Sequence, residues 1–198
     1  MADEYNETRL AALPDEVKSY LAADWYSEEA REDGDGLKTF NASLIKPSLD
    51  IKINAQVMLL KNLDLANGLA NGSMGIVVEY DKDNLPVVRF TNGVVRSIGR
   101  SETEVMQNGK LYAKRTQIPL RLAWATTIHK CQGMTFDRIS CDLKRSFADG
   151  QVYVALSRTK TLEGLFVESF NPKKLTANPV ALGFYNWVAH TKQISSNH

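Results

Sequence analysis

The sequence divides into three regions that differ in the pattern of their apolar and polar positions. The first begins with a short helical pattern over residues 6–13, which Pro14 ends, and continues with a strand-like run over residues 17–21. Residues 24–42 are acidic and carry Gly34-Asp35-Gly36 at their centre, which is typical of a surface loop. We therefore expect a helix, a strand and a long loop before the pattern changes near residue 51.

The middle region predicts a small β-rich domain. Short runs of β-type residues follow one another at residues 55–60, 75–80, 86–90, 94–98 and 111–116. The turn signals between them are Asn71-Gly72, residues 81–84 and Asn92-Gly93, and such residues tolerate the positive backbone angles of tight hairpins. The pattern indicates a small barrel or sandwich rather than helices.

The third region, after Pro119, alternates strand-like and helical segments. We expect strands at residues 120–126, 138–143 and 164–170, a helix opening near His129 and another helix at residues 150–160. This alternation is typical of parallel strands joined by crossover helices, so the expected fold class is α/β. A last helix at residues 178–192 should pack one apolar face on the sheet. That face carries Val180, Phe184, Trp187 and Val188.

The composition is that of an ordinary globular protein. Its 198 residues are 43% hydrophobic, which fits one domain or two small ones, and no apolar run approaches the roughly 20 residues that cross a bilayer. The acidic start is unlike a secretion signal. Cys131 and Cys141 lack the paired spacing of metal ligands, and we expect free thiols in a reducing compartment, with a disulfide left open. These features favour an intracellular protein with no membrane partner and no metal site.

Charge is distributed unevenly along the chain. Residues 1–40 hold 11 acidic and 4 basic side chains, a net charge of −7, whereas residues 41–198 hold 12 acidic and 20 basic ones, a net charge of +8. A polyanionic partner such as a nucleic acid fits the second part only. A solvated basic face explains the asymmetry equally well, so both interpretations stay open.

Two polar constellations occur in the third region. Residues 126–133 follow an apolar strand directly, where backbone N–H groups and short side chains bind anions. The run is Thr126-Thr127-Ile128-His129-Lys130-Cys131-Gln132-Gly133. The helix at residues 150–160 presents Arg158, and an arginine fixed there can donate a charge-assisted fork to a phosphoryl group. A polar helix cap and a salt-bridged surface arginine are the alternative interpretations.

The sequence lacks a complete nucleotide-hydrolysing site. The P-loop pattern G-x-x-x-x-G-K-[ST] does not occur: Gly109-Lys110 precedes Leu111, and Glu104 stands where the pattern needs glycine. No apolar strand ends in the acidic pair that positions magnesium and water, and no Ser-His-Asp arrangement is visible. We expect solvated imidazoles at His190 and His198. The three tryptophans are expected to pack in the core or loops rather than stack on bases; they are Trp25, Trp124 and Trp187.

Taken together, several segments resemble the carboxy-terminal region of the petite-integration-frequency (Pif) type DNA helicases, a branch of superfamily one, over about residues 6–172. The segments are residues 6–14, 55–63, 68–75, 85–90, 119–135 and 150–158. The last two resemble the family's motifs five and six. They contain Leu122-Ala123-Trp124-Ala125, Ile128-His129-Lys130-x-Gln132-Gly133 and Tyr153-Val154-Ala155-Leu156-Ser157-Arg158.

The resemblance implies an incomplete RecA-like, P-loop-type motor domain with a small Src-homology-3-like β-barrel inserted in it. Residues 1–59 and 119–198 would form most of the second RecA-like domain, and residues 60–118 would form the barrel. The first RecA-like domain and the opening strand and helix of the second would be missing. The chain would then be inactive alone, either as a truncated piece of a longer enzyme or as a natural remnant.

The resemblance also implies an ATP-dependent helicase that moves five-prime to three-prime along DNA. Arg158 would act in catalysis at the ATP γ-phosphate, Gln132 and Gly133 would complete the ATP-binding set, and Thr127, His129 and Lys130 would contact the DNA backbone. ATP and magnesium would belong to the complete enzyme, with none held by this chain alone. The partners would be single-stranded or forked DNA and the missing first domain. In eukaryotes the family works in the nucleus or the mitochondrion, in DNA repair, recombination and telomere maintenance.

One departure and two alternatives remain. Cys131 stands where the family usually has serine, and a thiol is the weaker hydrogen-bond donor, so a strand contact there would be softened. A different class of function is a non-catalytic nucleic-acid or protein interaction module built around the small barrel. A helicase of a neighbouring lineage, such as the rolling-circle transposon or RecD-like enzymes, shares the H-K-x-Q-G pattern and the terminal arginine.

Overall fold

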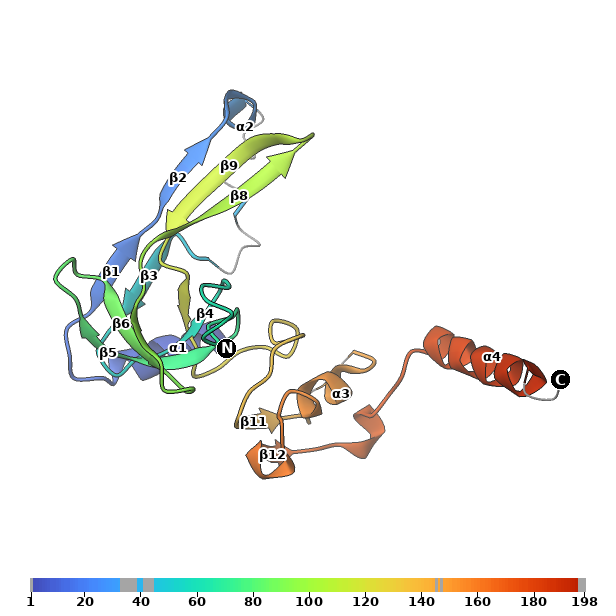
Figure 1. Cartoon of the computed structure of the whole chain (residues 1–198). Coiled ribbons are helices and arrows are strands. Elements are labelled where there is room, and N and C mark those ends of the chain that lie inside the picture. The colour runs from blue at the N-terminus through green and yellow to red at the C-terminus, as the bar shows by residue number, and fades with distance from the viewer. Residues whose placement is uncertain (1, 33–38, 41–44, 145, 147, 196–198) are drawn as a thin grey trace. The chain divides into compact units, whose positions relative to one another are not determined.

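The computed structural model describes residues 2–32, 39–40, 45–144, 146 and 148–195 of the chain (Figure 1). It consists of two compact units, residues 1–126 and 127–198, each of which is described by itself. Gly34-Asp35-Gly36, the centre of the expected acidic loop, lies outside the described residues, as do His198 and the side chain of His190.

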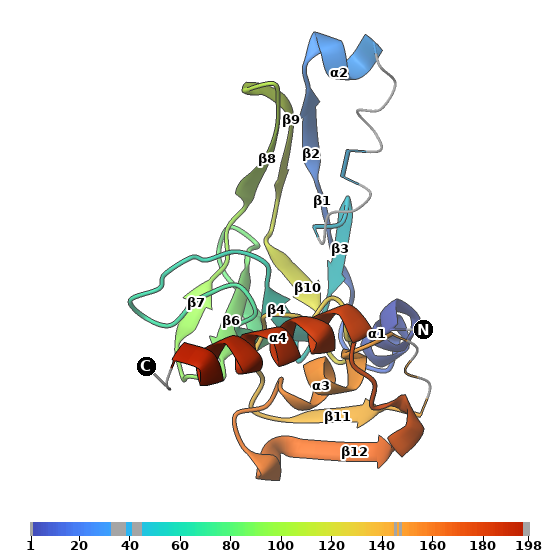
Figure 2. The same ribbon diagram turned by 90° about the vertical axis from the view of Figure 1, so that its right-hand side faces the viewer.

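The first unit consists mainly of antiparallel strands. Its helices are α1 (Ala2–Ala11) and α2 (Glu28–Glu32). Its strands are β1 (Lys18–Leu21), β2 (Ala23–Tyr26), β3 (Ser48–Ile51), β4 (Gln56–Leu59), β5 (Met74–Tyr80), β6 (Pro86–Phe90), β7 (Val95–Ser97), β8 (Ser101–Gln107), β9 (Lys110–Gln117) and β10 (Leu120–Leu122). The main sheet has the order β10-β4-β5-β6-β7, and β1 pairs with β3. The sheet β2-β9-β8 extends away from the main sheet as an arm (Figures 1 and 2).

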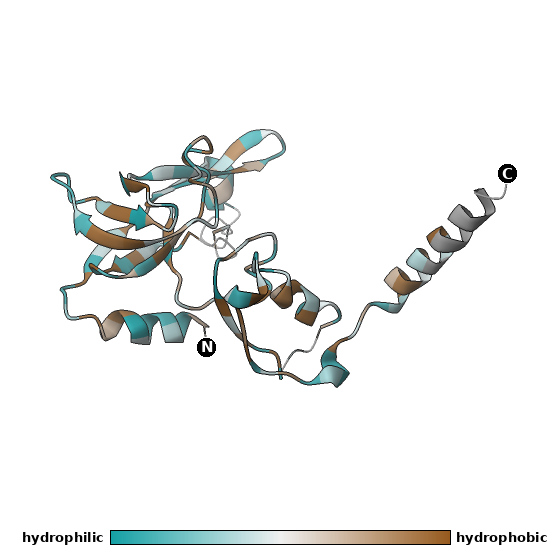
Figure 3. Cartoon of the chain, turned by 60° about the horizontal axis from the view of Figure 1, so that its bottom comes forward, coloured by the Kyte–Doolittle hydropathy of each residue, from teal (hydrophilic) through white to brown (hydrophobic). Residues whose placement is uncertain are grey.

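The core of the first unit lies against the main sheet, because alternate strand residues point toward it. Val57 and Leu59 of β4 are fully buried, and Leu120 of β10 joins the same hydrophobic cluster. Figure 3 shows brown hydrophobic and teal hydrophilic residues interspersed along the strands of this unit. At Gly75 of β5 an added Cβ would lie 2.5 Å from Cγ1 of Val88, so β5 and β6 approach closely only because this position carries no side chain.

The turns of the first unit follow the predicted signals. Asn84 has φ 61° and Gly93 has φ 88°, the positive backbone angles expected between β5 and β6 and between β6 and β7. A turn that was not anticipated joins β8 to β9 at Asn108 and Gly109, with φ 52° and 75°. Two consecutive positive φ angles are typical of the tight hairpin that matches strand twist, so Gly109 serves a turn rather than a phosphate loop.

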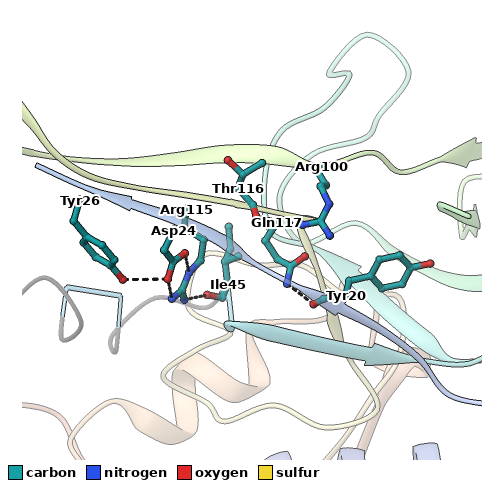
Figure 4. Close-up of polar contacts among 8 residues, drawn as sticks. All are labelled: Tyr20, Asp24, Tyr26, Ile45, Arg100, Arg115, Thr116 and Gln117. Carbon is teal, nitrogen blue, oxygen red and sulfur yellow. Dashed lines mark hydrogen bonds and ion pairs between the residues drawn. The ribbon is translucent and has the colours of Figure 1, made fainter. Parts of the chain in front are cut away.

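The arm is fixed at its base by a buried arginine (Figure 4). Arg115 of β9 is 5% exposed and lies opposite Asp24 of β2 in the strand register. Its Nε and Nη2 donate to the two carboxylate oxygens of Asp24 at 2.7 and 2.6 Å, and its Nη1 donates to the Ile45 carbonyl at 2.9 Å. The Tyr26 hydroxyl donates to Asp24 at 3.1 Å. Because the pair is bidentate and largely shielded, it fixes the register of β2 against β9.

A buried glutamine continues this network toward the main sheet. Gln117 is 1% exposed; its Nε2 donates to the Tyr20 carbonyl at 2.6 Å and its Oε1 accepts from the Ile118 amide at 2.8 Å. Burial raises the pKa of Tyr20 to about 12, and its hydroxyl donates to the Asn84 carbonyl. β1 is thereby attached both to β9 and to the turn after β5.

Most expected elements of the first unit are confirmed, but the expected loop at residues 24–42 is wrong in its first part. The strand runs near residues 18, 56, 75, 86, 95 and 111 and the opening helix are present. β2 and α2 occupy the start of the acidic segment, and β3 and β8 were not anticipated. β2 reads Ala23-Asp24-Trp25-Tyr26, in which Trp25 and Tyr26 favour a strand and Ala23 and Asp24 do not, and it forms its strand by pairing with β9.

The expected Src-homology-3-like barrel is not found, because the described strands form open sheets and none closes into a barrel. The run at residues 120–126 was expected as a parallel strand but is shorter, and β10 pairs antiparallel with β4. Only Ile118 and Pro119 separate β9 from β10, and Ile118 and Leu120 are buried in the core of the first unit. This short connection and the burial keep β10 on the main sheet.

The second unit contains the expected strand–helix–strand pattern. Its elements are β11 (Ile139–Asp142), α3 (Gln151–Leu156), a 3-10 turn η1 (Leu162–Gly164), β12 (Leu165–Ser169), a 3-10 turn η2 (Pro172–Lys174) and α4 (Pro179–Ser195). β11 and β12 are parallel, and α3 lies between them in sequence, which confirms the predicted crossover. Leu143, Val152 and Ala155 form a small buried cluster with α3 as its centre.

The last helix forms as expected, but its expected packing is wrong. In α4 the side chains of Val180, Phe184 and Trp187 are 80%, 58% and 64% exposed. The sheet of this unit has only two described strands, so it offers a narrow face for the helix to cover. No described helix is both long enough and apolar enough to cross a membrane.

The Asp24–Arg115 pair predicts an acid-sensitive arm. The hydrogen bond with Arg115 is the main cause that lowers the pKa of Asp24 below its ordinary value of 3.8. A lowered carboxylate pKa stabilises the fold above the unfolded value and loses that contribution as pH falls through the folded value. We expect Asp24→Asn to lower the free energy of unfolding by about 1–3 kcal/mol at pH 7 and to flatten its decline between pH 4 and pH 2.

Urea titrations at several pH values, followed by circular dichroism, measure this effect. Glu102→Gln is the matched control, because Glu102 pairs with Lys114 at 2.9 Å while its side chain is 51% exposed, and exposed pairs contribute little. Equal acid dependence of Asp24→Asn and the unaltered chain would contradict the prediction.

Candidate functional site

Residues 127–133 form a compact turn at the start of the second unit. The Cys131 amide donates to the Thr127 carbonyl at 3.1 Å and the Met134 amide donates to the Cys131 carbonyl at 3.0 Å, which makes about one helical turn. Gly133 has φ +81° and ends it. The helix that was expected to open near His129 does not form. Thr127 and Ile128 are β-branched and Gly133 follows closely, so the segment is too short and too poor in helix formers to propagate.

The turn separates an inward from an outward side. Ile128 packs against the Leu143–Val152–Ala155 cluster. Cys131 is 6% exposed, and its thiol donates to the Ile128 carbonyl at 3.1 Å. The remaining members of the turn are exposed: Thr127, His129, Lys130, Gln132 and Gly133. The structure therefore leaves these five residues exposed, and residues 127–133 are called the polar turn below.

Cys131 lies on the inward side, so its thiol contributes to packing rather than to an outward contact. Burial raises the pKa of the thiol, and the positive charge of Arg158 opposes that shift. Cys141 on β11 also has a pKa raised by burial. Both cysteines are free thiols, as predicted. A DNA contact by the Cys131 thiol was expected to be weaker than one by serine. A thiol that faces inward does not make that contact.

Arg158 lies just beyond the end of α3 and is held by neutral oxygen atoms. Its Nε donates to the Val154 carbonyl at 2.8 Å, its Nη1 to the Met134 carbonyl at 3.0 Å and its Nη2 to the Ser157 hydroxyl at 2.9 Å. It forms no ion pair with a carboxylate of the described residues. The guanidinium is thus held in position by neutral acceptors, with no ion pair to a carboxylate among the residues that the structure describes.

Backbone contacts join the segment after the polar turn to the segment after α3. The Phe136 amide donates to the Arg158 carbonyl at 2.8 Å, and Phe136 forms a parallel bridge with Thr159. Lys160 pairs with Asp137 at 2.8 Å. Together with the Arg158–Met134 bond, these contacts hold the arginine next to the residue that follows Gly133. Arg158 and the polar turn therefore belong to one rigidly connected structure.

Asn6 fixes the chain just before the polar turn, within the first unit. Its side chain is 3% exposed; its Nδ2 donates to the Ala125 carbonyl at 2.9 Å and its Oδ1 accepts from the Ala125 amide at 2.8 Å. Sequence analysis quoted Asn6 only as part of the resemblance. A signal for this role was present, since a polar residue on the inward face of a helix requires a buried partner.

Other expectations for the site residues have mixed outcomes. Trp124 is partly buried and packs against the core of the first unit, as expected. Trp25 lies on β2 and Trp187 on α4, where they are 44% and 64% exposed, so the expectation that they pack in the core or in loops is wrong. Over the described residues, no group of three or more His, Cys, Asp or Glu side chains is close enough to hold a metal ion.

Comparisons with known proteins place this arrangement in a family. A family model described as "DNA helicase Pif1, 2B domain" matches residues 39–80. The ATP-dependent DNA helicase PIF1 of Xenopus laevis is 46% identical over 184 residues, which cover 91% of this chain and 28% of that protein. The human ATP-dependent DNA helicase PIF1 is 41% identical over 193 residues, covering 96% of this chain and 29% of that protein.

The chain belongs to the Pif1 helicase family. It spans less than a third of the length of these curated relatives. The crystal structure of Pif1 helicase from Candida albicans aligns with a TM-score of 0.76 at 29% identity, over 94% of this chain and 47% of that one. Unliganded Pif1 from Bacteroides sp aligns with a TM-score of 0.77 at 29% identity, over 93% and 42%. The α/β architecture thus corresponds to part of the RecA-like helicase fold.

The contact between the two joined segments of this Pif1-family chain predicts a steric sensitivity at Gly164. A Cβ added there would lie 2.1 Å from the Asp137 carbonyl oxygen, whereas one added at Gly133 would meet nothing within 4 Å. We expect Gly164→Ala to destabilise the second unit by about 1–3 kcal/mol, because the backbone must shift. Gly133→Ala should cost only about 1 kcal/mol, the strain of its positive φ.

Amide hydrogen exchange of the peptides that span residues 134–143 and 158–164 measures the difference. Gly164→Ala should accelerate exchange in both peptides, and Gly133→Ala should accelerate it much less. Equal exchange in the two variants would show that the segment joined to Arg158 is not tightly packed.

Proposed function

We propose that this chain supplies the strand-gripping and phosphate-contacting part of an ATP-dependent DNA helicase that moves five-prime to three-prime. The observation that carries the proposal is the bond between Arg158 Nη1 and the Met134 carbonyl, which joins a fixed cation to the exit of the polar turn. A motor needs nucleotide state and strand hold to change together, and a direct connection between the two groups supplies that link. Relatives named ATP-dependent DNA helicase PIF1 support the activity.

The polar turn is the proposed single-stranded DNA contact. Thr127, His129 and Lys130 are exposed and offer a hydroxyl, an imidazole and an ammonium group, each of which can meet a phosphate. Bacteroides Pif1, a structural neighbour, has been crystallised bound to single-stranded DNA, and another structural neighbour represents DNA unwinding at forked double-stranded DNA by two coordinating Pif1 helicases. We assign single-stranded or forked DNA as the partner of the complete enzyme on these grounds.

Arg158 is the proposed arginine finger. Gln132 and Gly133 are the other proposed ATP-binding residues. A guanidinium that carries no local counter-charge can stabilise the negative charge that develops on a transferring phosphoryl group. A structural neighbour was crystallised with ADP-AlF4, which supports ATP as the nucleotide of the complete enzyme. The P-loop and the magnesium ligands would come from a first RecA-like domain, and this chain alone would not hydrolyse ATP.

The proposed domain assignment places residues 1–59 and 119–198 in the second RecA-like domain and residues 60–118 in an insertion. The antiparallel pairing of β4 with β10 supports it, because Leu59 at the end of β4 lies opposite Leu120 at the start of β10. A segment that leaves and returns at adjacent positions can be inserted without separating its flanks. β4 also pairs with β5, so the first strand of the proposed insertion is bonded directly to a strand of the proposed RecA-like domain.

The proposed strand contact predicts a defined salt dependence. In a complete motor made by joining this chain to a first RecA-like domain, Lys130→Ala should weaken binding of single-stranded DNA and reduce the slope of log affinity against log salt by about 1. Lys110→Ala, an exposed lysine on the arm, is the matched control and should leave the slope unchanged. Fluorescence anisotropy at several salt concentrations measures both; identical slopes for the two variants would remove Lys130 from the interface.

The alternative function, a non-catalytic nucleic-acid or protein interaction module, predicts a different result with the chain alone. Tight, salt-sensitive binding of single-stranded DNA by the isolated chain would favour the module. Negligible binding would favour a part of a motor that needs its other half.

The proposed finger predicts a separation of ATP turnover from strand binding. In the complete motor, Arg158→Ala should lower ATP turnover with saturating single-stranded DNA by about 1,000-fold or more, while DNA affinity stays within a factor of about three. Steady-state ATP hydrolysis and anisotropy measure the two effects. Unchanged turnover would refute the assignment of Arg158.

A further inference from the structure

The guanidinium of Arg158 is part of a closed set of hydrogen bonds with Ser157 and Val154. The Val154 carbonyl accepts from Arg158 Nε at 2.8 Å and from the Ser157 hydroxyl at 3.2 Å. The Ser157 oxygen in turn accepts from Arg158 Nη2 at 2.9 Å. A hydroxyl has one proton to donate, and here that proton goes to Val154, so the lone pairs of Ser157 face the arginine.

This arrangement gives Ser157 a specific orientation that a helix-end serine does not need. The serine occupies the position that ends α3, and its backbone amide already bonds within the helix. Its side chain is exposed and could be hydrated, yet it completes the third of three fixed acceptors around the guanidinium. Each acceptor is neutral, so the three bonds restrict the position of the cation without reducing its net charge.

We propose that Ser157 is a positioning residue for Arg158, which it holds ready to meet a phosphoryl group. The inference rests on the proposed function of Arg158 and adds the group that orients it. Arginine has five N–H donors, and the three bonds to Val154, Met134 and Ser157 leave two that a phosphate oxygen can take. Pre-fixed donors of this kind avoid the cost of reorganisation during the reaction.

The arrangement explains why lysine could not replace this arginine. A lysine ammonium carries three donors at a single point and cannot span the Met134 carbonyl and the Ser157 hydroxyl, which bond to different nitrogen atoms. The position therefore requires a planar guanidinium, and the hydroxyl of Ser157 is one of the acceptors that hold it.

The first test uses this chain by itself and does not depend on ATP hydrolysis. In nitrogen-15 NMR spectra, with Arg158→Lys used for assignment, the Nη2 protons of Arg158 should exchange slowly with solvent in the unaltered chain. Ser157→Ala should accelerate that exchange several-fold, and Ser157→Thr, which keeps the hydroxyl, should restore it. Ser140→Ala is the matched control, because the Ser140 hydroxyl bonds to Glu168 and not to Arg158. Equal exchange in Ser157→Ala and the unaltered chain would overturn the inference.

The second test measures the consequence in a complete motor. Ser157→Ala should lower kcat for ATP by about 10- to 100-fold, leave KM for ATP and affinity for single-stranded DNA unchanged, and be rescued by Ser157→Thr. A change in NMR exchange without a change in kcat would overturn the positioning role. If Arg158→Ala itself leaves turnover unchanged, the proposed function fails; if only Ser157→Ala is silent, the positioning role alone fails.

Discussion

The antiparallel pairing of β4 with β10 is the contact on which the first unit depends. It brings residues 120–122 beside residues 57–59, closes one edge of the main sheet and buries Leu59 and Leu120 in the same core. Everything between the two strands, from the loop after β4 to the end of β9, must leave and return at this point. The pairing also fixes where the chain emerges toward Ala125, whose backbone groups are held by buried Asn6.

A large hydrophobic core holds the elements of the first unit together, whereas a few hydrogen bonds serve this purpose in the second unit. The buried cluster around Leu143, Val152 and Ala155 is small, and the polar turn reaches it through Ile128. The connection between Arg158 and the segment after Gly133 is made by backbone and guanidinium donors to carbonyl oxygens. Such bonds position a cation without neutralising it, whereas a carboxylate partner would compensate the charge that phosphoryl transfer requires.

The contrast with Arg115 makes the same point within one chain. Arg115 is buried and bonds both oxygens of Asp24, so its charge is matched and its effect is to hold β2 against β9. Arg158 is partly buried and bonds only neutral acceptors. Two arginines with similar numbers of hydrogen bonds therefore differ in what they can do, and the difference lies in whether a carboxylate is present.

Local sequence signals predicted the elements that local physics controls. Asn92-Gly93 formed its turn because glycine tolerates a positive φ, and alternating apolar residues formed β5 and β6 because one side of each strand is buried. Asn108-Gly109 carried an equally strong hairpin signal that was considered only as a phosphate loop. Residues 127–133 form a single turn, but the helix expected at His129 does not form, since Ile128 and Cys131 hold the turn by burial rather than by helix propensity.

The sequence by itself determined which residues are chemically capable of gripping a strand and meeting a phosphate, because hydroxyl, imidazole, ammonium and guanidinium groups are properties of single residues. Only the tertiary structure decided that β2 is a strand, that β10 joins β4 rather than a parallel sheet, and that Cys131 faces inward. It also decided that Arg158 is held by Ser157 and Met134 and pairs with no carboxylate of the described residues. These outcomes depend on contacts between residues distant in the chain, or on the direction of one side chain, and neither is encoded in a local pattern.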